Sequence, residues 1–238
     1  PGMVAKLPDE FRDLVQAEGV TVLCQTPSAF RSFIQADSEV GDARYALRYV
    51  IFGGEALELQ SLAPWFDRYG DQTPSLVNMY GITETTVHVT WRPISAADLD
   101  RGSVIGEPIP DLQLYVLDPR TRQPSPIGIP GEMYVGGAGL ALGYLKRPEL
   151  TADRFPPNHL TGHDRLYKTG DLARVIPATD GLDLEFMGRI DDQVKIRGFR
   201  IELGEIESVL NTHPAVRESA VFPQMHNGEQ RLVAWLVN

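Results

Sequence analysis

The sequence predicts an α/β protein in which a parallel α/β sheet layer is followed by a distorted antiparallel β-barrel and the start of a small α+β subdomain. Three changes of hydrophobic pattern along the 238 residues support this prediction. Residues 1–90 alternate continuous apolar runs with helical periodicity, and residues 91–190 alternate with a period of two between turns rich in Pro and Gly. Residues 191–238 return to short strands around one helix, so we expect boundaries near residues 90 and 190.

The first segment contains three short apolar runs that are typical of buried parallel strands. Apolar residues at helical spacing predict a helix before each of them. The expected elements are a helix over 8–16, a strand over 20–24, a helix from Pro27, a strand over 49–52, a helix over 57–66 and a strand over 75–78. Ligands of such sheets bind beyond the carboxyl ends of the strands. Cys24, Gly53 and Asn78 lie at these ends, which predicts one shared pocket.

The other two segments are predicted from shorter patterns. The expected elements are strands over 112–117, 132–135 and 184–186, with turns at 124–131 and 180–181, and then two strand pieces around Gly198, a helix carrying Ile206, Val209 and Leu210, and strands over 216–222 and 232–237. The pattern shows no internal repeat.

Composition excludes several classes of function. The formal net charge of −10 argues against nucleic-acid binding, which depends on clustered Lys and Arg. A single cysteine, Cys24, excludes an internal disulfide framework and suits a reducing compartment. No apolar run has membrane-spanning length and no leader-like segment opens the chain, so we expect a cytoplasmic protein. Residues 1–4 look like an arbitrary start and residues 232–237 stop on an apolar strand, which together predict a partial chain.

The stretch NMYGITETT, residues 78–86, combines side chains that suit a nucleotide. Tyr80 can cover a base, and Gly81 lets backbone amides approach a phosphate. Thr83 and Thr85 offer hydroxyls to phosphate oxygens, while Glu84 is an oxygen ligand of the kind that Mg²⁺ prefers. A polar loop between two strands is the alternative interpretation of the same residues.

Four further stretches have both a chemical and a structural interpretation. The glycine-rich run 131–140 could cradle a phosphate, although turn glycines are favoured. Asp171 could cap a helix or accept hydrogen bonds from a ribose diol. Arg189 beside Asp191 has the pattern of a solvated surface pair. Residues 194–207 have the pattern of an exposed charged face.

Taken in this order, the stretches resemble the core motifs of adenylation domains of non-ribosomal peptide synthetases, within the superfamily that includes acyl-CoA synthetases and luciferases. The matching stretches are residues 78–84, 131–145, 167–172 and 188–207, and the resemblance covers the whole chain. The run 193–203 is similar to the peptide-synthetase branch in particular. The resemblance implies that residues 1–90 are the second half of the α/β core of the large subdomain, 91–190 its β-barrel part, and 191–238 a truncated or interrupted start of the mobile C-terminal subdomain.

The resemblance also implies a reaction and a set of residue roles. ATP and Mg²⁺ would activate an amino acid as its adenylate, and the acyl group would pass to the phosphopantetheine thiol of a carrier domain. Thr83, Glu84, Asp171 and Arg189 are the implied catalytic residues, with Thr83 on the phosphates and Glu84 on Mg²⁺. The implied ATP-binding residues are Gly54, Glu55, Ala56, Asn78, Tyr80, Gly81, Thr83, Asp171 and Arg189. Asp191 matches the hinge of the C-terminal subdomain.

Three parts of the family pattern are not in these 238 residues: the phosphate loop with its lysine, the aspartate that holds the amino group, and a C-terminal lysine. We therefore expect the chain alone to be inactive and to need the remainder of its domain. The positions that read the substrate in this family correspond here to Cys24, Ile51, Gly53, Met79, Val87 and His88. This set resembles that of threonine-activating domains, with His88 as partner of a β-hydroxyl, except that Cys24 stands where Asn is usual.

Two other functions stay open. The chain could be a non-catalytic scaffold that recruits a small MbtH-like accessory protein, which in this family binds near the stretch matching residues 150–155. It could also be an acyl-CoA or aryl-acid ligase, in which case it would select an acid with no regard for an α-amino group.

Overall fold

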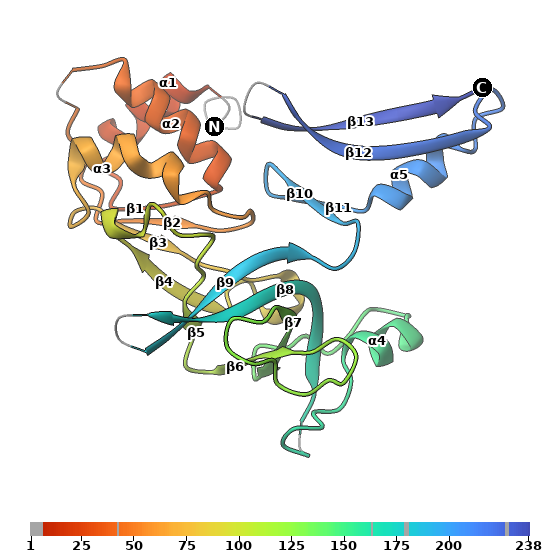
Figure 1. Cartoon of the computed structure of the whole chain (residues 1–238). Helices are drawn as coiled ribbons and strands as arrows, with labels where there is room; N and C mark the ends of the chain where they lie inside the picture. The colour runs from red at the N-terminus through yellow and green to blue at the C-terminus, as the bar shows by residue number, and fades with distance from the viewer. Residues whose placement is uncertain (1–6, 42, 163, 179–180, 227–228) are drawn as a thin grey trace.

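The computed structural model describes residues 7–41, 43–162, 164–178, 181–226 and 229–238 (Figure 1). The start at residues 1–4 and the first residue of the turn expected at 180–181 lie outside this part of the chain. The first sheet has the strand order β1-β2-β3-β4-β5. Its strands are β1 (Val22–Gln25), β2 (Tyr49–Phe52), β3 (Ser75–Asn78), β4 (Thr90–Ile94) and β5 (Glu107–Pro108).

The first three strands are parallel, as the sequence predicts, and β4 and β5 extend the sheet in antiparallel orientation. The flanking helices are α1 (Pro8–Ala17), α2 (Pro27–Ser38) and α3 (Ala63–Tyr69). The helix expected over 57–66 is divided, because a 3₁₀ turn (Leu59–Leu62) precedes α3, whose first turn contains Pro64. The helices pack on the strands through buried aromatic rings, with Phe30 5.1 Å from both Phe52 and Trp65 between ring centroids.

The second sheet is antiparallel and has the order β6-β7-β8-β9. Its strands are β6 (Leu112–Leu117), β7 (Gly131–Gly137), β8 (Leu166–Ala178) and β9 (Gly181–Arg189). The predicted barrel is not confirmed, since the described residues form an open sheet. The outer side of β9 meets Val104 through a bridge at Glu185 instead of closing onto β6. Helix α4 (Pro148–Arg154), which lies between β7 and β8, was not predicted.

Residues 131–137 of the glycine-rich run form β7, so the turn interpretation is wrong for Gly131, Gly136 and Gly137 and holds only for Gly139. A Cβ atom on Gly137, where φ is 114°, would lie 2.4 Å from the carbonyl oxygen of Asp111. Glycine is required there because the neighbouring backbone approaches so closely.

The C-terminal part consists of two hairpins and a helix. Strands β10 (Val194–Ile196) and β11 (Phe199–Ile201) form the first hairpin, helix α5 (Leu203–Leu210) follows, and β12 (Glu218–His226) pairs with β13 (Glu229–Val237). Each element coincides with a predicted one, within a few residues. None of the described helices is both long enough and apolar enough to cross a membrane.

Candidate functional site

The predicted pocket lies at the carboxyl ends of the parallel strands. Register places Cys24 opposite Ile51 and Phe52 opposite Asn78, so the segments that follow β1, β2 and β3 leave the sheet side by side. They enclose a cavity of about 500 Å³, and all six residues expected to read a substrate line it. The full lining is Cys24, Gln25, Thr26, Ile51, Gly53, Gly54, Met79, Gly81, Ile82, Thr83, Val87, His88, Lys195, Gly198 and Arg200.

The wall made by Val87 and His88 has a strained backbone. Thr86 and Val87 both have positive φ, at 60° and 74°, which is uncommon for residues with a Cβ atom. A Cβ atom on Gly81 would lie only 1.6 Å from the carbonyl oxygen of Val87, so glycine is needed for this turn to close. His88 is half-buried, and burial lowers the pKa of its imidazole, which keeps the ring neutral at pH 7. A neutral ring can either donate or accept a hydrogen bond in the cavity.

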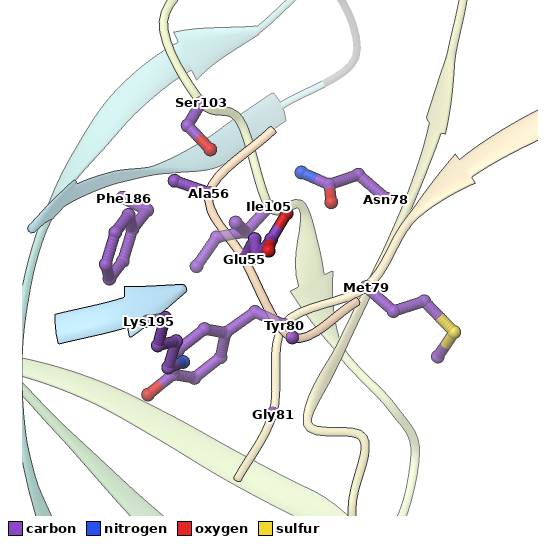
Figure 2. A pocket seen from close by; sticks show the side chains of 11 residues that line it. Glu55, Ala56, Asn78, Met79, Tyr80, Gly81, Ser103, Ile105, Phe186 and Lys195 are labelled. Carbon is purple, nitrogen blue, oxygen red and sulfur yellow. The ribbon is translucent and has the colours of Figure 1, made fainter. Parts of the chain in front are cut away.

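A second, narrower pocket of about 20 Å³ adjoins the large cavity (Figure 2). Six of the predicted nucleotide residues line it together with others, the whole set being Gly54, Glu55, Ala56, Asn78, Met79, Tyr80, Gly81, Ser103, Ile105, Phe186 and Lys195. The rings of Tyr80 and Phe186 are 6.2 Å apart between centroids, and the Lys195 ammonium lies 5.6 Å from the centre of the Tyr80 ring. Burial lowers the pKa of Lys195. This space is a slot lined by two aromatic rings and one cation.

Ser103 contributes an unsatisfied polar atom to this slot. Its Oγ is buried and has no hydrogen-bond partner within the part of the chain that the structure describes. A buried hydroxyl left unpaired is costly, so a ligand that bonds to it would remove that cost. The aromatic wall together with this free hydroxyl fits a purine ring with polar edges.

Asp171 and Arg189 lie beyond Tyr80 rather than in the lining of either pocket. The Tyr80 hydroxyl donates to Asp171 Oδ2 at 2.5 Å, and Arg189 Nη1 donates to Asp171 Oδ1 at 2.6 Å. Arg189 also holds Asp191 through Nε and Nη2, at 2.6 and 2.7 Å. Asp171 is fully buried in strand β8, so the helix-cap interpretation is wrong. The surface-pair interpretation of Arg189 is wrong as well, because its side chain is only 6% exposed.

The protonation states of Tyr80 and Arg189 fit their hydrogen bonds to Asp171. Burial raises the pKa of Tyr80 well above its usual value, and the neighbouring Asp171 carboxylate raises it further, so the phenol stays a donor. Burial by itself would lower the pKa of Arg189, but its bonds to Asp191 and the charge of Asp171 raise it instead. Arg189 therefore links Asp171, which is predicted to hold a ribose, to Asp191, which is predicted to be the hinge.

Glu84, the predicted magnesium ligand, is already engaged by protein groups. Arg200 Nη1 lies 3.2 and 3.1 Å from its two carboxylate oxygens, and the Tyr144 hydroxyl donates to Oε1 at 2.7 Å. Burial tends to raise the pKa of Glu84, but these two partners lower it overall, so the carboxylate is ionised. Thr83 is exposed at the rim of the large cavity. Among the described residues, no group of three or more His, Cys, Asp or Glu could enclose a metal ion.

Sequence reasoning about single stretches missed several residues of the site. Lys195 and Arg200 had been assigned to an exposed charged face, yet both line the large cavity. They are register partners in the β10–β11 hairpin, so they project from the same side of it. The alternation of basic and apolar residues in this short strand pair is the signal that could have found them. Ser103 and Phe186 carry no signal in their own sequence neighbourhoods.

The fold and its divided cavity define an α/β protein with a ligand site at the carboxyl edge of a parallel sheet. Residues 1–145 match the model of a family described as "AMP-binding enzyme". This match covers more than half of the chain, and the chain therefore belongs to the family of AMP-binding enzymes. Within it, the chain resembles the adenylation domains of non-ribosomal peptide synthetases, as its relatives show.

Two relatives illustrate this resemblance. The chain is 52% identical over 248 residues to a "Dimodular nonribosomal peptide synthase" of Bacillus subtilis (strain 168), covering 100% of the chain and 10% of that protein. It is 44% identical over 240 residues to "Syringomycin synthase SyrB1" of Pseudomonas syringae pv. syringae, covering 100% of the chain and 38% of that protein. The chain thus spans only a small part of the curated relatives it matches.

Solved structures support the same resemblance to adenylation domains. Holo-PA1221, described as a protein containing adenylation and PCP domains bound to a vinylsulfonamide inhibitor, superposes with a TM-score of 0.85 at 29% identity. That match covers 96% of this chain and 39% of the other. Holo-AB3403, a four-domain nonribosomal peptide synthetase bound to AMP and glycine, superposes with a TM-score of 0.68 at 37% identity, covering 99% of this chain and 17% of that one.

Proposed function

We propose that this chain is part of an amino-acid-activating adenylation domain, which forms an aminoacyl adenylate from ATP and an amino acid. The observation that carries this proposal is the pair of adjoining cavities that share Gly54, Met79, Gly81 and Lys195 in their walls. One cavity has the lining of a small-molecule pocket and the other that of a purine slot. A carboxylate in the first would meet the phosphates of a nucleotide in the second, and alignment of this kind is the main requirement of the reaction.

The roles of the nucleotide residues follow from the slot. Tyr80 would stack on adenine, between the backbone of residues 54–56 and Asn78, with Gly81 and Thr83 facing the phosphates. Asp171 would accept the ribose hydroxyls, with Arg189 beside it. Glu84 would hold Mg²⁺ as its single carboxylate, since Mg²⁺ keeps most of its waters in such sites. The ion would supply neutralisation of phosphate charge. The division at residues 90 and 190, with Asp191 as the hinge, belongs to the same proposal.

L-Threonine or a close relative is the proposed amino acid. Gly53 carries no side chain toward the cavity, and a Cβ atom there would lie 3.6 Å from His88 Cε1, so the imidazole stays open to a small substrate. A β-hydroxyl bonded to His88 would be selected over an isosteric methyl group, because the methyl would leave the half-buried ring unpaired. Cys24 in place of a stronger partner favours tolerance of a slightly larger relative.

A carrier domain is the proposed acceptor of the acyl group, through the thiol of its phosphopantetheine. Support comes from structural neighbours that are described as adenylation proteins with PCP domains. An MbtH-like protein is proposed as an additional partner at helix α4. The scaffold and the acyl- or aryl-acid ligase are less well supported, because the relatives are peptide synthetases and the divided cavity suits catalysis.

ATP–pyrophosphate exchange on the full-length protein tests this proposal, with a panel of amino acids and simple acids, and with or without an MbtH-like partner. The strongest exchange is expected with threonine. Exchange with another amino acid would keep the reaction and refute the assignment of the pocket, and exchange with acids that lack an α-amino group would indicate the acid ligase. Absence of exchange in folded protein would favour the scaffold. The 238-residue chain, assayed alone, is expected to be inactive.

A further inference from the structure

Strand β8 departs from regular pairing with β7 at one place, which includes Asp171. Between two regular pairs of the register, the single residue Met133 of β7 faces three residues of β8, 169–171. An irregularity of this kind is a β-bulge, which bends its strand and changes the direction of the side chains that it carries. Bulges are over-represented next to active sites. We call residues 169–171 the β8 bulge.

Two side chains supply hydrogen bonds that the regular β7–β8 ladder cannot make at the β8 bulge. Glu132 Oε1 accepts the backbone N–H of Gly170 at 3.1 Å. Thr169 Oγ1 accepts the backbone N–H of Asp171 at 2.9 Å and donates its own proton to the carbonyl oxygen of Met133 at 2.8 Å. Glu132 and Thr169 are both buried, so loss of either acceptor would leave a backbone N–H group unpaired away from water, which is costly.

Strand β9 and the residues after it hold the same bulge from another direction. Gly170 has φ of 74°, and a Cβ atom on it would lie 2.8 Å from Arg189 Nη2 and 3.2 Å from Asp191 Oδ2. Its carbonyl oxygen accepts the backbone N–H of Ile190 at 2.9 Å. The backbone of the β8 bulge therefore lies against the ion pair of Arg189 and Asp191, and the two acceptors on β7 and β8 keep it there.

The β8 bulge determines where the carboxylate of Asp171 lies. One carboxylate oxygen accepts from the Tyr80 hydroxyl at 2.5 Å and the other from Arg189 at 2.6 Å. An ionised carboxylate has about four acceptor positions, so these two bonds leave acceptor capacity for the ribose hydroxyls of the proposed function. A shift of the bulge backbone would move both oxygens together, because both belong to one side chain of the bulge.

We propose that Glu132 and Thr169 are positioning residues that hold the β8 bulge, so that the carboxylate of Asp171 can recognise the ribose hydroxyls of the nucleotide. This inference rests on the proposed function. The two cavities have linings that include neither residue, and both residues act through the backbone of residues 170–171. Recognition of the hydroxyls should depend on them, whereas stacking of the base on Tyr80 should not, since the bulge contributes nothing to that stacking.

The test compares the binding of AMP and of 2′,3′-dideoxy-AMP to the full-length protein by titration calorimetry. The unmodified protein should bind AMP about ten-fold more tightly or better, the factor that corresponds to one hydrogen bond to a charged group. Thr169→Val keeps the shape of the side chain without its hydroxyl, and Glu132→Leu removes the acceptor of the Gly170 N–H. In both variants the preference for AMP should fall to within about three-fold, while binding of the dideoxy nucleotide changes by less than about two-fold, because only the hydroxyls lose their partner.

Two matched variants separate positioning from general damage to the strand pair. Thr169→Ser keeps the hydroxyl and should retain the full preference for AMP. Tyr134→Phe removes a hydroxyl that donates to Glu132 Oε2 at 3.2 Å but leaves Glu132 Oε1 on the N–H of Gly170, so it should retain the preference as well. If Glu132→Leu does not fold, the comparison of Thr169→Val with Thr169→Ser decides by itself.

Hydrogen–deuterium exchange of residues 168–172 gives a readout independent of nucleotide binding. The amides of Gly170 and Asp171 should exchange faster in Thr169→Val and Glu132→Leu than in Tyr134→Phe. A preference for AMP that these two variants keep, an equal weakening of both nucleotides, or unchanged exchange of the two amides would overturn the inference. An unmodified protein that binds both nucleotides equally would instead refute the assignment of Asp171 to the ribose within the proposed function, and the role of the β8 bulge would fall with it.

Discussion

Gly81→Ala should displace the backbone of Val87 and His88, which forms one wall of the large cavity. The added Cβ atom would lie 1.6 Å from the oxygen of Val87, 2.6 Å from its carbonyl carbon and 2.7 Å from the Cα of His88. All three are backbone atoms, so no side-chain rotation relieves the clash. Ordinary contact begins at 3.4 Å, and the turn must therefore retreat by about 1.8 Å. Overpacking of this kind costs about 1–3 kcal/mol, and a ~1 Å displacement of a positioning group costs on the order of 100-fold in rate.

The assays are thermal unfolding and pyrophosphate exchange. For Gly81→Ala we expect the midpoint of unfolding to fall by roughly 4–8 °C, on the basis of about 2 kcal/mol in a domain of this size. We also expect exchange with threonine to fall by about 100-fold. Gly41→Ala is the matched control, because a Cβ atom there meets nothing within 4 Å. A Gly81→Ala protein with an unchanged midpoint and exchange within two-fold of the original would refute the reasoning.

Three further predictions concern the same site. Arg200→Met should lower the Mg²⁺ concentration that half-saturates exchange, by no more than about five-fold since the pair with Glu84 is partly exposed. An unchanged Mg²⁺ requirement would contradict the idea that Arg200 and Mg²⁺ compete for the Glu84 carboxylate. Because burial lowers the pKa of His88 below its ordinary 6.5, the ring protonates only below that pH, and the KM for threonine should rise only as the pH falls below 6.5. A KM that is flat from pH 5 to 8 would exclude this role. Ser103→Ala should raise the KM for ATP about ten-fold if its free hydroxyl meets the base, with the KM for threonine as the control.

The parallel half of the fold could be predicted from the sequence because its signals are local. The run 49–52 is apolar throughout and the run 75–78 has an apolar centre, and the observed bounds of both agree with the predicted ones. The shared pocket followed from topology alone, since the ends of neighbouring parallel strands must meet. The open form of the second sheet could not be predicted in this way, because the bridge between Val104 and Glu185 joins residues 81 apart and depends on tertiary packing.

The roles of charged residues were the least predictable part. Arg189 has the local pattern of a surface pair, yet the pairing of β8 with β9 sets it opposite Asp171 and buries it. Glu55 lines the slot as expected, but its carboxylate is engaged by Ser28 and Gly198, which is 143 residues away along the chain. Sequence patterns report which side chains are near in the chain, whereas the partner of a buried charge is set by the fold.

The β10–β11 hairpin, whose Lys195 lies over the Tyr80 ring and whose Arg200 pairs with Glu84, also implies an order of events in the proposed reaction. A slot of about 20 Å³ holds little more than one water molecule, so a purine can enter only after Lys195 leaves the ring of Tyr80. Lys195 and Arg200 are register partners in one hairpin, so a movement of that hairpin carries both side chains away. One movement therefore opens the slot and frees Glu84 for Mg²⁺. We expect exchange of the hairpin amides to rise when ATP and Mg²⁺ are added together, and to rise less with either alone, because each then displaces only one of the two contacts.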